Sequence, residues 1–284
     1  MVTSIVGGSE SAAMQVYRSE LIAEFEEGES WLRGCTTTEH MTEGNQVTFL
    51  VAGSGNASAV TRGINGLIPA RTDNNNQYTA TLQEWHDLVR KTKFNIFQSQ
   101  GNQRALMQKT CRYVLNRRLD KDVIDIFDTT TKNLGAPEAI SLMVPARAMT
   151  ILGNQEVPTE DEDALFAVCT PACLGYLMQI PEFNSADYVD NKYLTGSSKR
   201  LRRWAGFNWI FHPRLTGTGS ASEKCYFLHK ESVGSAFDME NLDTAIGYDK
   251  EHSYSFARAS SFTAAVMLQQ AGIVQFLHDG SGIS

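Results

Sequence analysis

The sequence predicts an α+β fold in which one long helix organises the chain. Residues 102–127 contain no Gly or Pro, and their apolar side chains recur at the three- and four-residue spacing of a single helical stripe. Strand-like segments precede and follow this helix without the regular alternation of strands and helices that marks a parallel α/β sheet. No internal repeat is present. These observations favour an α+β fold built around a central rod.

The rod begins at Asn102, a good N-terminal cap, and extends to Phe127. At 1.5 Å per residue, it would be about 39 Å long. Its apolar stripe comprises Met107, Cys111, Val114, Leu115, Leu119, Val123 and Ile126, and its polar faces carry Gln108, Lys109, Arg112, Asn116, Arg117, Asp120 and Lys121. Because the stripe is narrow, we expect other elements to pack along the rod while most of its circumference stays in water.

A polar segment separates two strand-like stretches before the rod. Residues 46–52 have strand character, residues 53–77 are rich in Gly, Asn, Ser and Thr, and extended chain resumes at Tyr78 and continues to Phe97. Loops of this length are uncommon inside a compact domain. An isolated two-stranded ribbon is only marginally stable in water. We therefore expect a protruding hairpin that a partner holds, which indicates assembly.

Shorter elements follow the rod. The expected helices are 141–153, 171–178 and 232–237, and the expected strands are 164–169, 207–211, 225–229, 253–259, 262–268 and 272–277.

Composition narrows the class of protein. The chain has 284 residues, 42% of them hydrophobic, and can bury a full core in one or two domains. Its longest apolar runs are too short to span a bilayer, so we expect no membrane contact. The N-terminus lacks the pattern of a secretion signal. Five cysteines without a disulfide-framework pattern fit reduced, buried thiols made in a cytoplasm.

Charge is distributed unevenly along the chain. The net charge of −7 argues against a general affinity of the surface for nucleic acid. Residues 1–44 carry eight glutamates against two arginines, whereas residues 84–132 carry ten Lys and Arg against six Asp and Glu. An acidic arm and a basic rod suggest attraction, either within a subunit or between neighbours. Two solvated faces that never meet are the alternative.

No residue pattern indicates catalysis. The chain has neither a G-x-x-x-x-G-K-[ST] loop nor a G-x-G-x-x-G motif between a strand and a helix. Cys169 and Cys173 are better explained as small buried residues than as ligands of zinc, which needs four ligands in a tight group. The six histidines are scattered and never occur at metal-ligand spacing. We therefore expect no enzyme, no cofactor and no metal site.

The order of elements resembles the major capsid protein of tailed double-stranded DNA bacteriophages, which has the Hong Kong 97-like fold. The stretches that carry the resemblance are residues 65–97 as extended loop, 100–124 as spine helix, and 163–183, 202–215 and 248–279 in the later domains. The resemblance covers nearly the whole chain. It implies an N-terminal arm (1–46), an extended hairpin loop (47–98), the spine helix with the first part of a peripheral domain (99–165), an axial domain (166–240) and a return to the peripheral domain (241–284).

The resemblance also implies a function. Copies of the chain would assemble as hexamers and pentamers into an icosahedral head that encloses double-stranded DNA without sequence-specific binding. The shell would assemble in the bacterial host cytoplasm and become the capsid of the virion. An encapsulin-type nanocompartment shell is the alternative with the same fold, and a metabolic enzyme with an unrecognised site is the alternative from another class.

Two departures from the family pattern carry expectations. Some members crosslink a lysine of the extended loop to a neighbouring asparagine, but the first lysine here is Lys91, so we expect a shell without crosslinks. Some members begin with a long scaffolding segment that is later cleaved. Because the spine already starts near Gly101, we expect a separate scaffolding protein, together with a portal.

Charged side chains are the candidates for contacts between subunits, and the acidic arm would cross a neighbouring spine. The candidates are Glu24, Glu26, Glu27 and Glu29 in the arm, Arg62 and Arg71 in the extended loop, Arg112, Arg117 and Arg118 on the spine, and Lys199, Arg200, Arg202 and Arg203 in the densest basic run. Three interpretations of that run are open: a solvated loop, a salt-bridged contact near a symmetry axis, which we favour, or a patch that touches packaged DNA.

Overall fold

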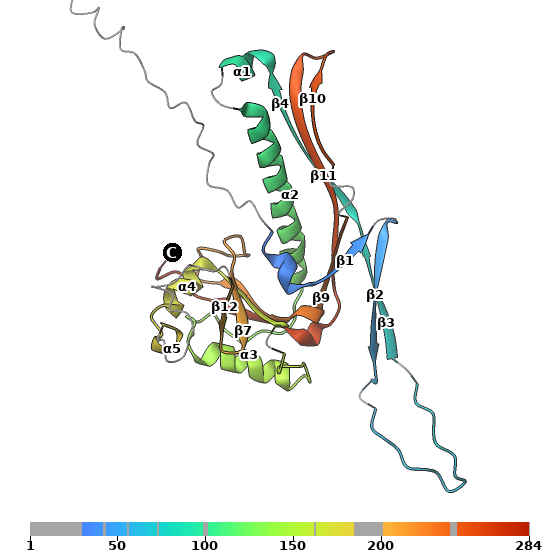
Figure 1. Ribbon diagram of the computed structural model, residues 1–284. Coiled ribbons are helices and arrows are strands. Elements are labelled where there is room, and N and C mark those ends of the chain that lie inside the picture. The colour runs from blue at the N-terminus through green and yellow to red at the C-terminus, as the bar shows by residue number, and fades with distance from the viewer. Residues whose placement is uncertain are drawn as a thin grey trace, which may run out of the picture.

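The computed structural model describes residues 30–41, 44–55, 57–72, 74–98, 102–161, 163–184, 201–238 and 243–283. Its centre is helix α2 (Gln103–Phe127), which runs beside a long sheet and ends against a compact body (Figure 1). The Asn102 side chain accepts a hydrogen bond from the backbone N–H of Ala105 at 3.2 Å, so the expected cap is confirmed.

The described strands form three sheets. The long sheet consists of β1 (Thr37–Met41), β9 (Val233–Asp238), β11 (Tyr254–Met267), β10 (Asp243–Asp249) and β4 (Gln83–Thr92). The compact sheet consists of β12 (Ile273–His278), β8 (Glu223–His229), β5 (Leu165–Cys169), β7 (Phe207–Phe211) and β6 (Leu201–Trp204). The third is the two-stranded ribbon of β2 (Gln46–Gly53) and β3 (Asn74–Thr81).

Short helices complete the described chain. They are α1 (Lys93–Gln98), α3 (Met143–Gly153), α4 (Pro171–Leu177) and α5 (Pro181–Asn184), with the 3₁₀ turns η1 (Leu32–Cys35), η2 (Lys230–Ser232) and η3 (Gln270–Gly272). Helices α3 to α5 contribute apolar side chains to one face of the compact sheet, where Trp209 and Phe227 are fully buried. The other face packs on the end of α2 and on η1. Strand β5 is therefore buried on both faces, which explains its uninterrupted apolar sequence.

The stripe on α2 is divided between two partners. Near its beginning, Met107, Cys111 and Leu115 pack on Ala257 and Ala259 of β11. Near its end, Val123 and Phe127 join the core of the compact sheet. One amphipathic helix thus holds the long sheet and the compact body together.

Three local expectations were wrong. Residues 233–238 form strand β9 instead of a helix, because they pair with both β1 and β11. Residues 93–98 form helix α1 instead of extended chain. The stretches 253–259 and 262–268 are not separate, since β11 runs unbroken through both and pairs with β10, β4 and β9.

The ribbon is attached through a small apolar core. Val47 and Phe49 of β2 pack with Ala80 of β3 and with Ala236 and Leu268 beneath them. A Cβ atom at Gly234 of β9 would lie 2.9 Å from the Phe49 ring, closer than carbon atoms approach in folded proteins. The glycine therefore makes the space in which the ring sits.

Asp120 differs most from expectation, because it is buried in the middle of α2 rather than solvated. Its carboxylate accepts hydrogen bonds from Ser30 Oγ at 2.5 Å, from the backbone N–H groups of Trp31 at 3.1 Å and Leu32 at 3.3 Å, and from His212 Nε2 at 3.2 Å. The backbone N–H of Arg214 donates to His212 Nδ1, so the ring proton lies on Nε2 and points at the carboxylate. Asp120 thereby fixes the start of the described chain and the turn after β7 to the helix.

Replacing Asp120 by Ala should lower the free energy of unfolding by about 3 kcal/mol, because several buried donors would lose their acceptor together. Urea unfolding of the purified protein measures this. Asp125→Ala is the matched control on the same helix, since its ion pair with Lys121 is exposed and contributes at most about 0.5 kcal/mol. Equal effects of the two substitutions would contradict the role given to Asp120.

Candidate subunit-interface surfaces

The first candidate surface is the face of α2 opposite its buried stripe. Arg112 is exposed there and has no polar partner among the described residues. Lys109 lies on the same face with its Nζ 5.4 Å from the centre of the Tyr113 ring. Arg117 is half-buried. These cations form a basic face that α2 presents away from both sheets.

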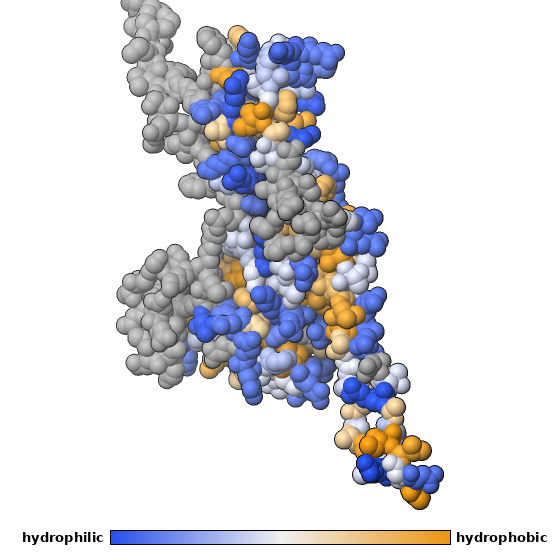
Figure 2. Space-filling model, turned by 45° about the vertical axis from the view of Figure 1, so that its right-hand side comes forward, coloured by the Kyte–Doolittle hydropathy of each residue, from blue (hydrophilic) through white to orange (hydrophobic). Residues whose placement is uncertain are grey.

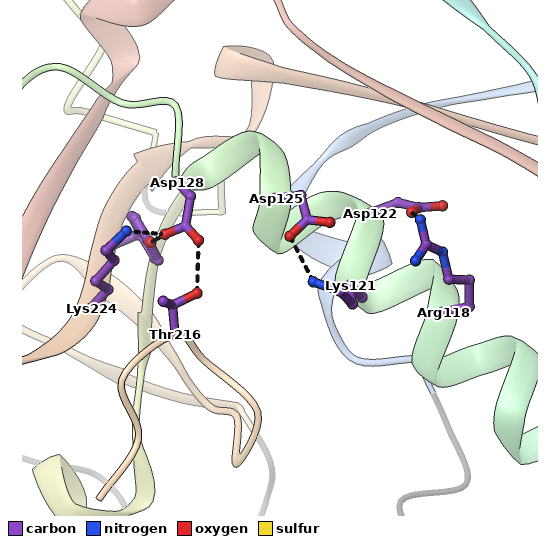
Figure 3. Close-up of polar contacts among 8 residues, drawn as sticks. Arg118, Lys121, Asp122, Asp125, Asp128, Thr216 and Lys224 are labelled. Atoms are coloured by element: carbon purple, nitrogen blue, oxygen red, sulfur yellow. Dashed lines mark hydrogen bonds and ion pairs between the residues drawn. The ribbon is translucent and has the colours of Figure 1, made fainter. Parts of the chain in front are cut away.

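Arg118, although also proposed for this surface, is engaged within the subunit. Its guanidinium forms an ion pair with Asp122 at 2.7 Å (Figure 3) and stacks on the Trp85 ring, 3.7 Å from its centre. Asp122 in turn accepts a hydrogen bond from Thr263 of β11 at 2.6 Å. Arg118 therefore joins α2 to the long sheet, and Arg112 is the better candidate for contact with another molecule.

Asp128 fixes the end of α2 to the compact sheet. Its carboxylate accepts hydrogen bonds from Lys224 at 2.9 Å and Thr216 at 2.7 Å (Figure 3), and from the Tyr226 hydroxyl. Burial raises the pKa of Asp128, but the hydrogen bonds from Tyr226, Lys224 and Thr216 outweigh it and hold the pKa below its ordinary value. Burial and the hydrogen bond to Asp128 raise the pKa of Tyr226.

The second candidate surface is the tip of the hairpin, residues 57–72, in which every residue is exposed. Val60, Ile64, Leu67 and Ile68 place apolar surface there, visible as the orange atoms at the end of the hairpin in Figure 2. A tight turn closes the tip, with hydrogen bonds from the Gly66 N–H to the Gly63 carbonyl and from the Gly63 N–H to the Leu67 carbonyl. Arg62 and Arg71 are exposed in the same segment.

The densest basic run is only partly described. Lys199 and Arg200 lie outside the described residues, and Arg202 lies in β6. Arg203 forms an ion pair with Asp163, and its Nε donates to Asn208 at 3.3 Å. Trp204 is buried against Phe183 and Trp209. Residues 201–204 are therefore a sheet strand and not a loop.

The candidate residues do not converge on one site. The arm residues Glu24, Glu26, Glu27 and Glu29 lie outside the described residues, while the others are distributed between the hairpin tip, α2 and β6. Within the described ranges, no group of three or more His, Cys, Asp or Glu side chains is placed to hold a metal ion. No helix of those ranges is both long and apolar enough to cross a membrane.

A family model for phage capsid proteins matches residues 10–279. The chain belongs to the phage capsid protein family. Membership of this family shows that the capsid protein is a structural protein of the icosahedral head and not an enzyme. The encapsulin and metabolic-enzyme alternatives are thus set aside.

Solved structures agree with the capsid protein in fold. The capsid of cyanophage P-SCSP1u has a TM-score of 0.71 at 11% identity, covering 95% of this chain and 94% of that one. A structure from Mycobacterium phage Che8 has a TM-score of 0.73 at 14% identity, covering 93% and 97%. The capsid of a native GTA particle has a TM-score of 0.69 at 14% identity, covering 98% and 100%. No curated protein sequence matches the capsid protein significantly.

Sequence reasoning missed the groups that hold the surfaces in place. Asp120 and Asp128 look like ordinary solvated carboxylates of a polar helix, and the partners of each lie about ninety residues away along the chain. No local pattern identifies such pairs.

Acid should weaken the hydrogen bonds that join Asp128, at the end of α2, to Lys224, Thr216 and Tyr226. Because its folded pKa lies below the ordinary value of 3.8, Asp128 stabilises the fold above that pH and loses this contribution as the pH falls through the folded pKa. We expect Asp128→Asn, and to a lesser degree Tyr226→Phe, to flatten the decline of the unfolding free energy between about pH 4 and pH 2. Denaturant titrations at a series of pH values measure this. Identical profiles for Asp128→Asn and the unmodified protein would refute it.

Proposed function

We propose that the capsid protein closes its shell as hexamers and pentamers through many small contacts, in which the hairpin of each copy lies over an adjacent copy. The observation that carries this proposal is the exposed apolar tip at residues 57–72. An apolar, solvent-exposed loop on a two-stranded ribbon is unfavourable for an isolated molecule and favourable once a partner covers it. Symmetry repeats each such contact around the shell.

The second proposed contact joins the arm to a spine. The acidic residues Glu24, Glu26, Glu27 and Glu29 would meet the basic face of α2 on a neighbouring copy near Arg112 and Arg117. Opposite charges of this kind steer association and set register more than they add affinity. The densest basic run would contact a neighbour near a symmetry axis through Lys199, Arg200, Arg202 and Arg203.

The proposed division of the chain follows the family. The arm is residues 1–46, the extended loop 47–98, the spine with the first peripheral part 99–165, the axial domain 166–240 and the peripheral return 241–284. Strand β4 lies in the extended-loop segment yet pairs with β11, so the long sheet unites the loop with the peripheral return.

Further partners complete the proposal. A separate scaffolding protein and a portal would guide assembly in the bacterial host cytoplasm, and the finished head would enclose double-stranded DNA without reading its sequence. The net charge of −7 supports the last point, because a net-acidic shell has little general affinity for the DNA that must enter and leave it. Electron microscopy of the purified protein, expressed with its scaffold, tests the proposal: closed particles are expected, and a compact monomer that forms none would overturn it.

Arg112→Glu should reduce the yield of closed particles while leaving the unfolding free energy unchanged, because the exposed guanidinium forms no hydrogen bond or ion pair with a described group of its own subunit. Electron microscopy and urea unfolding measure the two effects, and Arg112→Lys serves as the charge-conserving control. Arg118→Glu should instead lower the unfolding free energy by about 1 kcal/mol, since it removes the stacking on Trp85 and the ion pair with Asp122. Normal particle yield from Arg112→Glu would count against the spine contact.

Particles boiled in denaturing detergent should run as single chains on a gel, because residues 53–77 contain no lysine that could form a covalent bond to a neighbour. A ladder of covalent multimers from the unmodified protein under reducing conditions would disprove this expectation.

A further inference from the structure

A groove of about 660 Å³ lies at the root of the hairpin. One wall is β2, and the other contains Thr37 and Glu39 of β1, Glu231 of η2, and Leu268 and Gln269, which precede η3. Within the described chain, β2 pairs only with β3, and β1 lies at the end of the long sheet and pairs only with β9. The unpaired edge of β2 therefore runs along the groove, and its outward N–H and C=O groups have no strand partner within the described chain, which is the arrangement that accepts an added strand.

The side chains of the groove combine apolar and acidic surface. Leu268 lines the groove on the side of Val47 and Phe49, and Leu50, which is 65% exposed, adds apolar surface on the other side of β2. Glu39 and Glu231 are exposed at its wall and have no ionic partner among the described residues. The groove therefore suits an extended segment that carries both an apolar side chain and a cation.

The hairpin tip has that chemistry. Its residues 57–62, Ala-Ser-Ala-Val-Thr-Arg, have no regular secondary structure and contain no Pro that would block strand pairing. Val60 is 59% exposed. Arg62 is exposed two residues later and has no ionic partner in the described part of the chain. On an extended chain, residues two apart face the same side, so Val60 and Arg62 would enter the groove together.

We propose that the groove between β1 and β2 receives the hairpin tip of a second copy, with residues 57–62 adding as a strand to the free edge of β2. Val60 of the second copy packs near Leu268, and its Arg62, on the same side of the added strand, lies near Glu39 and Glu231. This rests on the proposed function, in which copies meet in a shell, and it names the surface that covers the tip.

A copy cannot fill its own groove without refolding its hairpin. The groove runs along β2, and the tip begins only beyond the end of that strand at Gly53. The tip continues in the same direction, away from β1 (Figure 1). The complementary chemistry of tip and groove therefore joins one copy to the next, and repetition of this head-to-tail contact closes a ring.

Crosslinking in assembled particles tests the contact directly. Particles of the Leu50→Cys/Val60→Cys double variant are treated with a short bismaleimide and run on a denaturing gel. A ladder of dimers and higher multimers is expected, whereas a link within one copy leaves a single-chain band. Each single variant is the matched control and should give no ladder, because the five native cysteines are buried. Intact double-variant particles that yield only single chains would overturn the inference and leave the shell function standing; failure of the unmodified protein to form particles would overturn the shell function itself.

Charge exchange provides a second measurement. Arg62→Glu alone, and Glu39→Arg/Glu231→Arg alone, should each lower the particle yield about tenfold by placing like charges together. The combined triple variant restores opposite charges across the contact and should recover most of the yield. Wild-type yield from Arg62→Glu, or a triple variant no better than its parents, would contradict the assignment of the groove.

Discussion

Helix α2 has one apolar stripe, and both large sheets of the subunit depend on it. A helix of 25 residues that packed along its whole length on one partner would need a partner equally long. Here the first half of the stripe lies on the long sheet, where the small residues Ala257 and Ala259 allow close approach, and the second half enters the core of the compact body. The relative position of the two bodies is therefore set by one rigid element rather than by a flexible linker.

Polar groups make this arrangement specific. Apolar packing alone would tolerate small shifts of the helix along its axis, because hydrophobic contact is not directional. Asp120 and Asp128 accept hydrogen bonds from three different parts of the chain, and a shift of one residue would leave several of those buried donors without a partner. Residues 30–32, the compact sheet and α2 are consequently held in fixed positions relative to one another.

Much of the fold could be predicted from the sequence because its signals are local. The Asn102 cap, the stripe on α2, the apolar run of β5 and the protruding ribbon each depend on residues close together in the chain. Residues 233–238 could not be assigned in this way, since Val-Gly-Ser-Ala-Phe-Asp has no strong preference and becomes a strand only between β1 and β11. The groove could not be predicted either, because part of its wall, Glu231, Leu268 and Gln269, lies about two hundred residues along the chain from β1 and β2. The sequence identifies charged residues as candidates for contacts between subunits, but it does not show which of them are already paired. In the structure Arg118 is engaged by Asp122 and Trp85 of its own subunit, whereas Arg112 has no such partner among the described residues.

The contact of the Phe49 ring with Gly234 is the point about which the ribbon can rotate. Strand β2 extends about 14 Å beyond Phe49 and then continues into the tip, so a rotation of the ribbon about this contact displaces the tip while the strands themselves stay unchanged. Identical subunits in a closed shell cannot all have identical surroundings when rings of five and rings of six coexist. In the proposed shell of hexamers and pentamers, a change of angle of the ribbon would accommodate that unequal spacing, and the cores of the subunits would not need to deform.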